Sequence, residues 1–384
     1  MDRRHAVGRQ PQAGLDPGRF RTWFRGTQRP CRGFVQDHRL LVGAGRTLYC
    51  LGRSGDRHSL AGRSRTDTVA EGSAWRRAGR RRGFRMKILL TGRFGQVGYE
   101  LERTLQAVGE VVAVDRSQMD LGDFRRVREV VRAVRPNLIV NAAAYTAVDQ
   151  AEREPALAMR INGEAVAVMA DEAKLLGAAM IHYSTDYVFD GNKQGAYTES
   201  DPTCPVNAYG RSKLAGEQAV AAAGIAHLIL RTSWVYGMRG KNFLLTMLRL
   251  AQERDELRIV DDQHGAPTWS RTIAETTALI VARMSVVDGG RDSAVDADEM
   301  AANWKAHSGL YHLAAQGQTS WHGFAKAIFG ADAEAGKPLL TAIATADYPL
   351  PARRPANSVL ACESLMNTFC RLPEWGAALR LCRE

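Results

Sequence analysis

Two side chains that can share a proton, Tyr209 and Lys213, stand four positions apart in a segment that the sequence predicts to be helical. Residues at this spacing lie on one face of a helix, so both side chains can point into the same pocket. An ammonium close to a phenol lowers the phenol pKa from its ordinary value of about 10, and such a phenol can pass a proton to an oxygen that gains negative charge. Thr185, at the end of a predicted strand, can hold that same oxygen. The three residues predict a proton-transfer site; the alternatives are chance spacing on a solvated helix and ordinary turn chemistry at the strand end.

A glycine turn predicts a dinucleotide beside this site. The apolar run 86–90 is followed by three glycines, each separated by two residues, and then by an amphipathic segment. These glycines are Gly92, Gly95 and Gly98. Glycine lets a strand-to-helix turn approach a diphosphate closely, while the free amides at the helix start face the anion. The pattern alone is common, but Asp115 follows it by about 20 residues, where such folds place a carboxylate on the adenosine ribose.

Strand and helix patterns alternate along the chain. Further apolar runs predict strands at 111–114, 138–144, 179–185 and 228–230, and helical spacing predicts helices at 124–134 and 150–176. This alternation predicts an α/β fold with a Rossmann-like doubly wound parallel sheet, whose ligands lie beyond the carboxyl ends of the strands. At one such end, the small side chains of Ala142, Ala143 and Ala144 leave room for a flat ring.

The remainder of the chain predicts a second, smaller lobe. We expect residues 86–238 to form the cofactor domain and residues 239–384 mainly a substrate-binding lobe, with some segments returning to the first domain. Helices are expected at 242–253, 272–284 and 321–328, and the polar segment 285–308 is expected to bulge from the surface.

Charge is distributed unevenly over the 384 residues. Twenty arginines, no lysine and six acidic residues give residues 1–85 a net charge of +14, so the rest of the chain carries −3 of the total +11. The first 85 residues have three interpretations: a disordered nucleic-acid-binding arm, a targeting peptide, or a start site assigned too early with Met86 as the true first residue. We favour the last, because the first predicted strand begins at Met86, and we expect no nucleic acid partner.

The remaining composition points to the cytosol. Six scattered cysteines form no C-x-x-C pair, which is typical of reduced, incidental thiols. No apolar run approaches the roughly 18 residues that a membrane-spanning helix needs, so no membrane partner is expected.

The chemistry-bearing segments resemble a known family. The glycine turn, residues 184–189 (STDYVF) and residues 209–213 (YGRSK) resemble the extended short-chain dehydrogenase/reductases. Within that superfamily, the sequence is similar to the dTDP-4-dehydrorhamnose reductases from Met86 nearly to the C-terminus. The strings that carry this similarity are 141–149 (NAAAYTAVD), 231–236 (RTSWVY), 241–243 (KNF), 262–268 (DQHGAPT), 309–313 (GLYHL) and 353–358 (RRPANS).

The resemblance implies reduction of the C4 ketone of dTDP-4-dehydro-L-rhamnose to dTDP-L-rhamnose. It implies that Tyr209 gives the proton, that Lys213 tunes Tyr209 and binds the nicotinamide ribose, and that Thr185 orients the carbonyl. The implied substrate contacts are Val148, Thr185, Tyr187, Tyr209 and Trp234. The expected cofactor contacts are Gly92, Phe94, Gly95, Gln96, Val97, Gly98, Asp115, Arg116, Asp120, Leu121, Ala142, Ala143, Ala144, Tyr209 and Lys213.

Cofactor, metal and partner are less constrained. Asp115 favours NADH, because a carboxylate repels a ribose 2′-phosphate, whereas Arg116 favours NADPH, so both remain expected.

Some family members hold magnesium between two subunits; Glu100 matches one ligand, but Arg271 stands at another, so no metal is predicted. The resemblance leaves a homodimer open.

Two other functions remain as alternatives. One is a catalytically idle nucleotide-binding regulatory subunit, which the presence of Thr185, Tyr209 and Lys213 disfavours. The other is another nucleotide-sugar reductase or epimerase of the superfamily. Epimerases and dehydratases usually carry Asp-Glu after the threonine, whereas this chain has Asp186-Tyr187.

Overall fold

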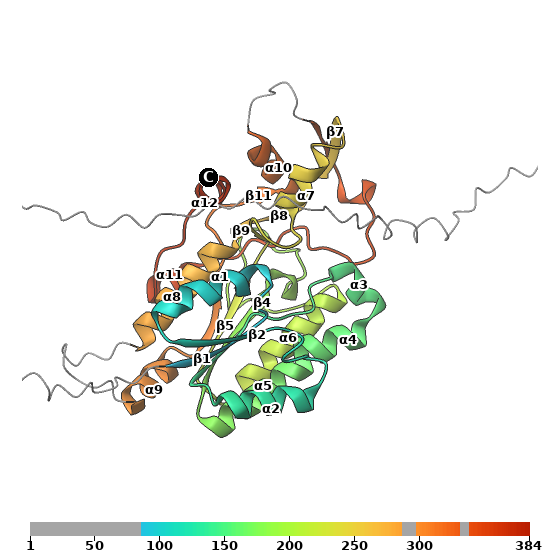
Figure 1. The fold of residues 1–384 in the computed structure, drawn as a ribbon. Helices are drawn as coiled ribbons and strands as arrows, with labels where there is room; N and C mark the ends of the chain where they lie inside the picture. The colour runs from blue at the N-terminus through green and yellow to red at the C-terminus, as the bar shows by residue number, and fades with distance from the viewer. Residues whose placement is uncertain (1–85, 286–296, 331–337) are drawn as a thin grey trace, which may run out of the picture. The chain divides into compact units, whose positions relative to one another are not determined.

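A parallel six-stranded sheet forms the centre of the part of the chain that the computed structural model describes, residues 86–285, 297–330 and 338–384 (Figure 1). Its strand order is β2-β1-β3-β4-β5-β10. The bounds are β1 (Lys87–Thr91), β2 (Glu110–Val114), β3 (Leu138–Asn141), β4 (Ala179–Thr185), β5 (His227–Thr232) and β10 (Gly309–His312). The register pairs Thr91 with Asn141 and Thr185 with Thr232, so these carboxyl ends reach one edge of the sheet. The doubly wound parallel fold predicted from the sequence is confirmed, and its direction of winding switches between β1 and β3.

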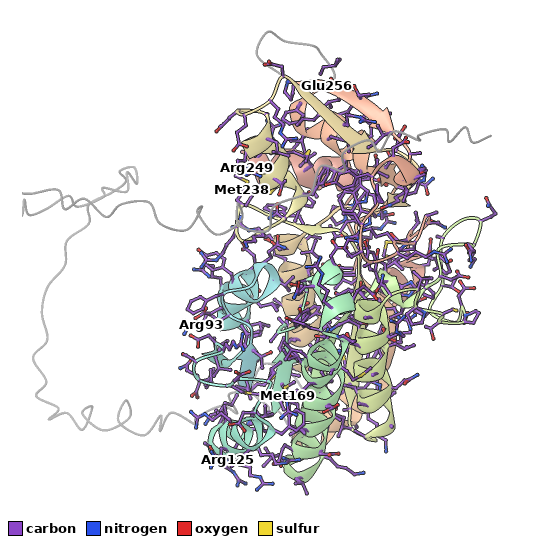
Figure 2. All side chains as sticks on the ribbon, turned by 90° about the vertical axis from the view of Figure 1, so that its right-hand side faces the viewer. Arg93, Arg125, Met169, Met238, Arg249 and Glu256 are labelled. Atoms are coloured by element: carbon purple, nitrogen blue, oxygen red, sulfur yellow. The ribbon has the colours of Figure 1, made fainter. Side chains whose placement is uncertain are left out.

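Helices cover both faces of this sheet. On one face lie α1 (Gln96–Thr104) and α8 (Ser270–Ser285), and on the other α2 (Phe124–Val134), α5 (Ala165–Leu176) and α6 (Ala208–Ala222) (Figure 1). Strand β1 serves both layers, because Ile88 and Leu90 belong to one apolar core and Leu89 to the other. Figure 2 shows Met169 inside the second layer, whereas Arg125 extends from its surface.

The helix expected over 150–176 is broken, and that prediction was wrong in this respect. The segment folds as α3 (Val148–Arg153), α4 (Pro155–Met159), a π-helical turn η4 (Arg160–Glu164) and then α5. Pro155 has no amide hydrogen and therefore starts a new helix rather than continuing α3. Within η4, the side chain of Asn162 bonds the backbone of Tyr145 and the hydroxyl of Ser212, which ties this turn to the start of α6.

The smaller lobe is built around a two-stranded parallel sheet of β7 (Glu256–Val260) and β12 (Leu339–Ile343). Helices α7 (Phe243–Leu250), α10 (Trp321–Phe329) and α12 (Trp375–Arg383) share an apolar core with it. Short connecting elements complete the lobe and its junction: β6 (Val235–Tyr236), β8 (His264–Gly265), β9 (Thr268–Trp269), β11 (Thr319–Ser320) and α11 (Glu363–Thr368), with turns η3 (Leu105–Ala107), η5 (Asp186–Val188) and η6 (Thr345–Asp347). Figure 2 shows Glu256 at the far end of this lobe.

Two expectations for the C-terminal half change. Helix α8 packs against α1 on the large sheet rather than in the lobe. The expected surface bulge 285–308 contains α9 (Ala297–Ala306), whose Met300 and Trp304 are buried against the main core. Residues 286–296 and the leader 1–85 lie outside the described residues, and the domain boundary at 238 stays a prediction. Among the described helices, none is both long and apolar enough to cross a membrane.

Candidate active site

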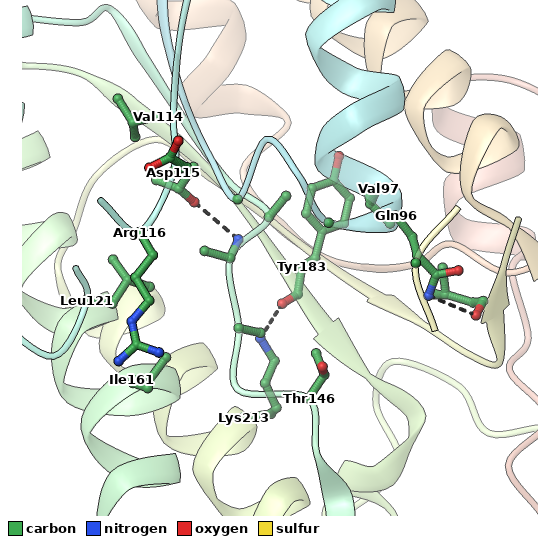
Figure 3. Close-up of a pocket in the computed structure, with 18 of the residues that line it drawn as sticks. Gln96, Val97, Val114, Asp115, Arg116, Leu121, Thr146, Ile161, Tyr183 and Lys213 are labelled. Carbon is green, nitrogen blue, oxygen red and sulfur yellow. Dashed lines mark hydrogen bonds between the residues drawn. The ribbon is translucent and has the colours of Figure 1, made fainter. Parts of the chain in front are cut away.

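A cavity of about 480 Å³ opens at the carboxyl edge of the sheet, beside the switch between β1 and β3 (Figure 3). Most of the expected cofactor contacts line it: Gly92, Gly95, Gln96, Val97, Asp115, Arg116, Asp120, Leu121, Ala142, Ala143, Ala144, Tyr209 and Lys213. Figure 3 shows Asp115 and Arg116 at one end of the cavity and Gln96 toward the other. The cavity therefore brings together residues that the sequence placed on four separate segments.

The glycine turn is shaped for close approach. Gly92 has a φ of +74°, and a Cβ there would come within 2.8 Å of the Ala143 amide nitrogen. A Cβ on Gly98 would come within 2.1 Å of the Gly92 carbonyl oxygen, so Gly98 serves the packing of α1 on the turn. Phe94 does not line the cavity; it is exposed beneath the Arg93 guanidinium. Gly95 stands before α1 and leaves its first amides free for an anion.

One end of the cavity carries the two charged residues, Asp115 and Arg116, that the sequence analysis assigned to the cofactor. The Asp115 carboxylate accepts hydrogen bonds from the backbone and hydroxyl of Ser117, at 2.7 and 2.5 Å. The side-chain bond from Ser117 is the main cause that holds the pKa of Asp115 below its ordinary value. Arg116 is exposed and forms an ion pair with Asp120 at 3.3 Å. One Asp115 oxygen is thus already engaged by its own turn, and the exposed Arg116 guanidinium follows it in the chain.

Lys213 is the buried cation of the site. Its Nζ donates to the carbonyl oxygen of Tyr183 at 2.6 Å and lies 3.4 Å from His182 Nε2 (Figure 3). Burial lowers the pKa of Lys213 to about 8, although Glu217 one helical turn further along raises it. Lys213 is therefore mostly protonated at neutral pH, and it lines the first cavity.

Tyr209 differs from the sequence expectation in its pKa. Burial raises the pKa of Tyr209 to about 12, against the opposing effect of Thr185, and the ammonium of Lys213 is turned to Tyr183 instead. The expected lowering by the lysine is therefore wrong for this arrangement, because burial outweighs it. Tyr209 keeps its proton at neutral pH, which is the form that a proton donor needs.

Thr185 lies at the end of β4, buried beside Tyr209. Its Oγ1 donates to Asp186 Oδ1 at 2.8 Å and accepts from the Tyr187 amide at 3.2 Å. The ring of Tyr187 meets that of Tyr209 edge to face, with centroids 6.0 Å apart. Thr185 and Tyr209 are thus adjacent, and the third predicted catalytic residue, Lys213, lines the same cavity as Tyr209.

A second cavity of about 940 Å³ adjoins Tyr187 and extends into the smaller lobe. Its walls come from α7, β7, β12 and the segment 347–354, and they include four arginines: Arg254, Arg258, Arg353 and Arg354. Arg354 is ion-paired with Asp149 at 2.8 Å, so it does not stand free. Because Tyr209 lines the first cavity and Tyr187 the second, the two cavities come together at this pair of rings.

Two expected substrate contacts, Trp234 and Val148, line neither cavity. Trp234 adopts a φ of +46° and stacks on Trp321 at 3.6 Å between ring centroids, and Trp321 lines the second cavity. Gly265 permits this stack, since a Cβ there would come within 2.5 Å of the Trp234 ring. Val148, the first residue of α3, lines neither cavity.

Several residues that line the first cavity were not predicted from the sequence. Thr91, Ser184 and Thr232 all lie at or next to the carboxyl ends of strands that open into the first cavity. Thr91 also holds the turn, because its hydroxyl donates to Asn141 and accepts from the Ala143 amide. The strand-end position is the signal that could have identified them.

The expected metal position holds an ion pair. Arg271 Nε lies 3.3 Å from Glu100 Oε2, so the carboxylate already has a cation. Within the described residues, no group of three or more His, Cys, Asp or Glu side chains is arranged to hold a metal. The absence of a metal stays a prediction.

Comparisons with known proteins agree on one family. A family model described as RmlD substrate binding domain matches residues 86–384. A dTDP-4-dehydrorhamnose reductase of Burkholderia thailandensis is 51% identical over 304 residues, covering 77% of this chain and 98% of the relative; that of Escherichia coli K12 is 46% identical over 304 residues, covering 77% and 96%. The crystal structure of dTDP-4-dehydrorhamnose reductase from Bacillus anthracis in complex with NADP has a TM-score of 0.69 at 33% identity, covering 78% of this chain and 99% of that one. This chain therefore belongs to the dTDP-4-dehydrorhamnose reductase family.

Proposed function

We propose that this protein uses NADPH or NADH to reduce the C4 ketone of dTDP-4-dehydro-L-rhamnose to dTDP-L-rhamnose. The observation that carries the proposal is the meeting of two cavities at Tyr209, with Thr185 beside it and Lys213 beneath the first cavity. An idle subunit has no need of this complete set.

The first cavity fits a nicotinamide dinucleotide. The cradle at Gly92, which a Cβ would fill, and the free amides at the start of α1 suit the diphosphate. Asp115 and Arg116 lie where the adenosine ribose is expected, and Lys213 at the opposite, nicotinamide end. Gly98 lets helix α1 pack against the glycine turn at Gly92. We assign Phe94 to the rim of the cofactor site.

The second cavity fits the nucleotide sugar. Its arginines suit the diphosphate, because guanidinium groups match phosphate oxygens. We assign Tyr187 and Trp234 to the sugar, with Trp321 as the ring that supports Trp234. Val148 at the start of α3 lines neither cavity, so its assignment to the substrate rests on the family resemblance alone.

Proton transfer follows from the residues at the junction. When bound, the nicotinamide supplies the hydride that reduces the ketone carbon. Tyr209 donates its proton to the ketone oxygen as negative charge develops there, and Thr185 orients that oxygen. The Lys213 ammonium, fixed on the Tyr183 carbonyl, lines the same cavity as Tyr209 and supplies positive charge there when Tyr209 becomes a phenolate.

The proposal is tested by following NAD(P)H absorbance with the full chain. The rate should depend on dTDP-4-dehydro-L-rhamnose and saturate with it, and the product should be dTDP-L-rhamnose. An unchanged absorbance at saturating sugar nucleotide and cofactor would overturn the proposal. The homodimer and the cytosolic location expected from the sequence remain part of the proposal, and so does the choice between the two cofactors.

Gly92→Ala should weaken cofactor binding. The new Cβ meets the backbone of Ala143, while the positive φ adds strain. Gly195→Ala is the matched control, because Gly195 has a φ of +79° but open space around it. Both variants should lose about 1 kcal/mol of stability from the left-handed backbone, and Gly92→Ala should lose more because its Cβ clashes with the Ala143 backbone. Only Gly92→Ala should raise the cofactor Kd of the folded protein, by about 10-fold or more. Equal cofactor Kd values for the two variants would show that close approach at Gly92 is unimportant.

Chelation should leave the enzyme unchanged. Because Arg271 already neutralises Glu100, addition of EDTA should alter neither the initial rate nor Tm. A loss of either that magnesium restores would contradict the prediction of no metal.

A further inference from the structure

Asp186 is a buried carboxyl that the proposed mechanism does not use. It follows Thr185 directly and begins the short turn η5, where only 3% of its surface is exposed to solvent. Its Oδ1 accepts the Thr185 hydroxyl proton, but its Oδ2 has no hydrogen-bond partner among the described residues. The nearby Ser358 hydroxyl donates to the His264 carbonyl oxygen at 3.3 Å. A carboxylate here would be buried with half of its acceptor capacity unsatisfied.

The groups around the Asp186 carboxyl do little to stabilise a negative charge on it. The titratable and charged groups around it are Tyr187 on the same turn, Tyr209 on α6, and the ion pair of Arg354 with Asp149 beyond Tyr187. The two phenols are neutral, and the charges of the ion pair offset each other. The ammonium of Lys213 is held by the Tyr183 carbonyl. Burial therefore raises the pKa of Asp186 to about 7, although the Ser358 and Thr185 hydroxyls lower it.

The protonation of Asp186 decides where the Thr185 proton goes. An ionised carboxylate can only accept, so it takes the single hydroxyl proton of Thr185. A neutral carboxyl can instead donate to Thr185 Oγ1, which then has its own proton available for another acceptor. The Tyr187 amide donates to the same oxygen in either case.

We propose that Asp186 is a positioning residue that works in its protonated form: its carboxyl donates to Thr185 Oγ1 and frees the Thr185 hydroxyl to donate to the ketone oxygen. This inference rests on the proposed function, because it assigns a hydrogen-bond direction to the same site. Ionisation of Asp186 reverses that direction and withdraws the donor from the substrate.

Asp186→Asn tests the direction, because an amide nitrogen can donate to Thr185 at any pH. With dTDP-4-dehydro-L-rhamnose, kcat of the unmodified enzyme should fall above pH 7, as Asp186 loses its proton. The variant should retain kcat near pH 6.5, and the pH at which its kcat falls should move up by about one unit, to the pH of about 8 where Lys213 loses its proton. Asp171→Asn, which removes one exposed carboxylate from α5, should leave the pH at which kcat falls unchanged. Two results with folded Asp186→Asn would overturn the proposal: a kcat that falls at the same pH as in the unmodified enzyme, or a kcat that is already lost at pH 6.5.

Two further measurements do not depend on turnover. In protein labelled with carbon-13 at aspartate carboxyls, one resonance should titrate near neutral pH, and Asp186→Asn should remove it. If the variant does not fold, the presence or absence of that titrating resonance in the unmodified protein decides whether a neutral carboxyl exists. Since the folded-state pKa of Asp186 is raised, its own contribution to stability should fall as pH rises from about 4 to about 7. The Tm of the unmodified protein minus that of Asp186→Asn should therefore decrease over this range. If the Asp186 resonance titrates near neutral pH but the unmodified protein does not reduce the sugar, the proposed function is contradicted. The protonated state of Asp186 is then still supported.

Discussion

Tyr209→Phe should lose about 100-fold or more in kcat, the contribution of a positioned general acid. Phenylalanine keeps the ring that lines the first cavity and meets Tyr187, so the change removes only the hydroxyl and its proton. Because the hydroxyl stays protonated at neutral pH, its loss removes the donor itself and not merely a polar contact.

The cofactor should bind to this variant as it does to the unmodified enzyme, as measured by fluorescence titration of NADPH. Tyr99→Phe is a suitable control, because the Tyr99 ring lies under the Arg103 and Arg239 guanidinium groups and lines neither the first nor the second cavity, so it should keep full kcat. Normal kcat in Tyr209→Phe would require another proton donor.

Glu217→Gln should lower the free energy of unfolding by about 3–5 kcal/mol, because it leaves a buried guanidinium without its counter-charge. Glu217 on α6 binds Arg231 on β5 through two hydrogen bonds of 2.9 and 2.7 Å. Both side chains are almost fully buried, with 6% and 4% of their surface exposed. Arginine cannot release its proton to relieve the cost, in contrast to lysine.

Glu253→Gln provides the matched control, since the Arg249–Glu253 pair is about half exposed on α7. Its cost should stay within about 1 kcal/mol. Replacing both Glu217 and Arg231 by leucine should recover much of the loss, because no unpaired charge remains. Urea unfolding of the four proteins measures all of these differences, and equal costs for the two glutamine variants would contradict a buried ion pair.

Short-range patterns predicted the framework of the site. The glycine turn, the strand ending at Thr185 and the pair Tyr209 and Lys213 depend on neighbours within a few residues, and the strands predicted around them are present. The position of Asp115 in the lining of the first cavity was predictable, because the spacing within a βαβ unit is regular.

Properties set by distant partners were not predictable in this way. The stack of Trp234 on Trp321 and the ion pair of Arg354 with Asp149, which are 205 residues apart, depend on how the smaller lobe folds back. The pKa of Tyr209 depends on the depth of burial, which residue spacing does not determine. An acid at a strand end, such as Asp186, is expected to face water, and only the packing of η5 encloses it.

The central claim is that this chain carries out hydride transfer to a nucleotide-sugar ketone, and isotope transfer tests it most directly. The full chain would be incubated with dTDP-4-dehydro-L-rhamnose and with NADPH or NADH deuterated at the transferred position of the nicotinamide. We expect dTDP-L-rhamnose with one deuterium at C4 of the sugar, detected by mass spectrometry and proton NMR. A reduced product without deuterium at C4, or no reduced sugar with either cofactor, would contradict it.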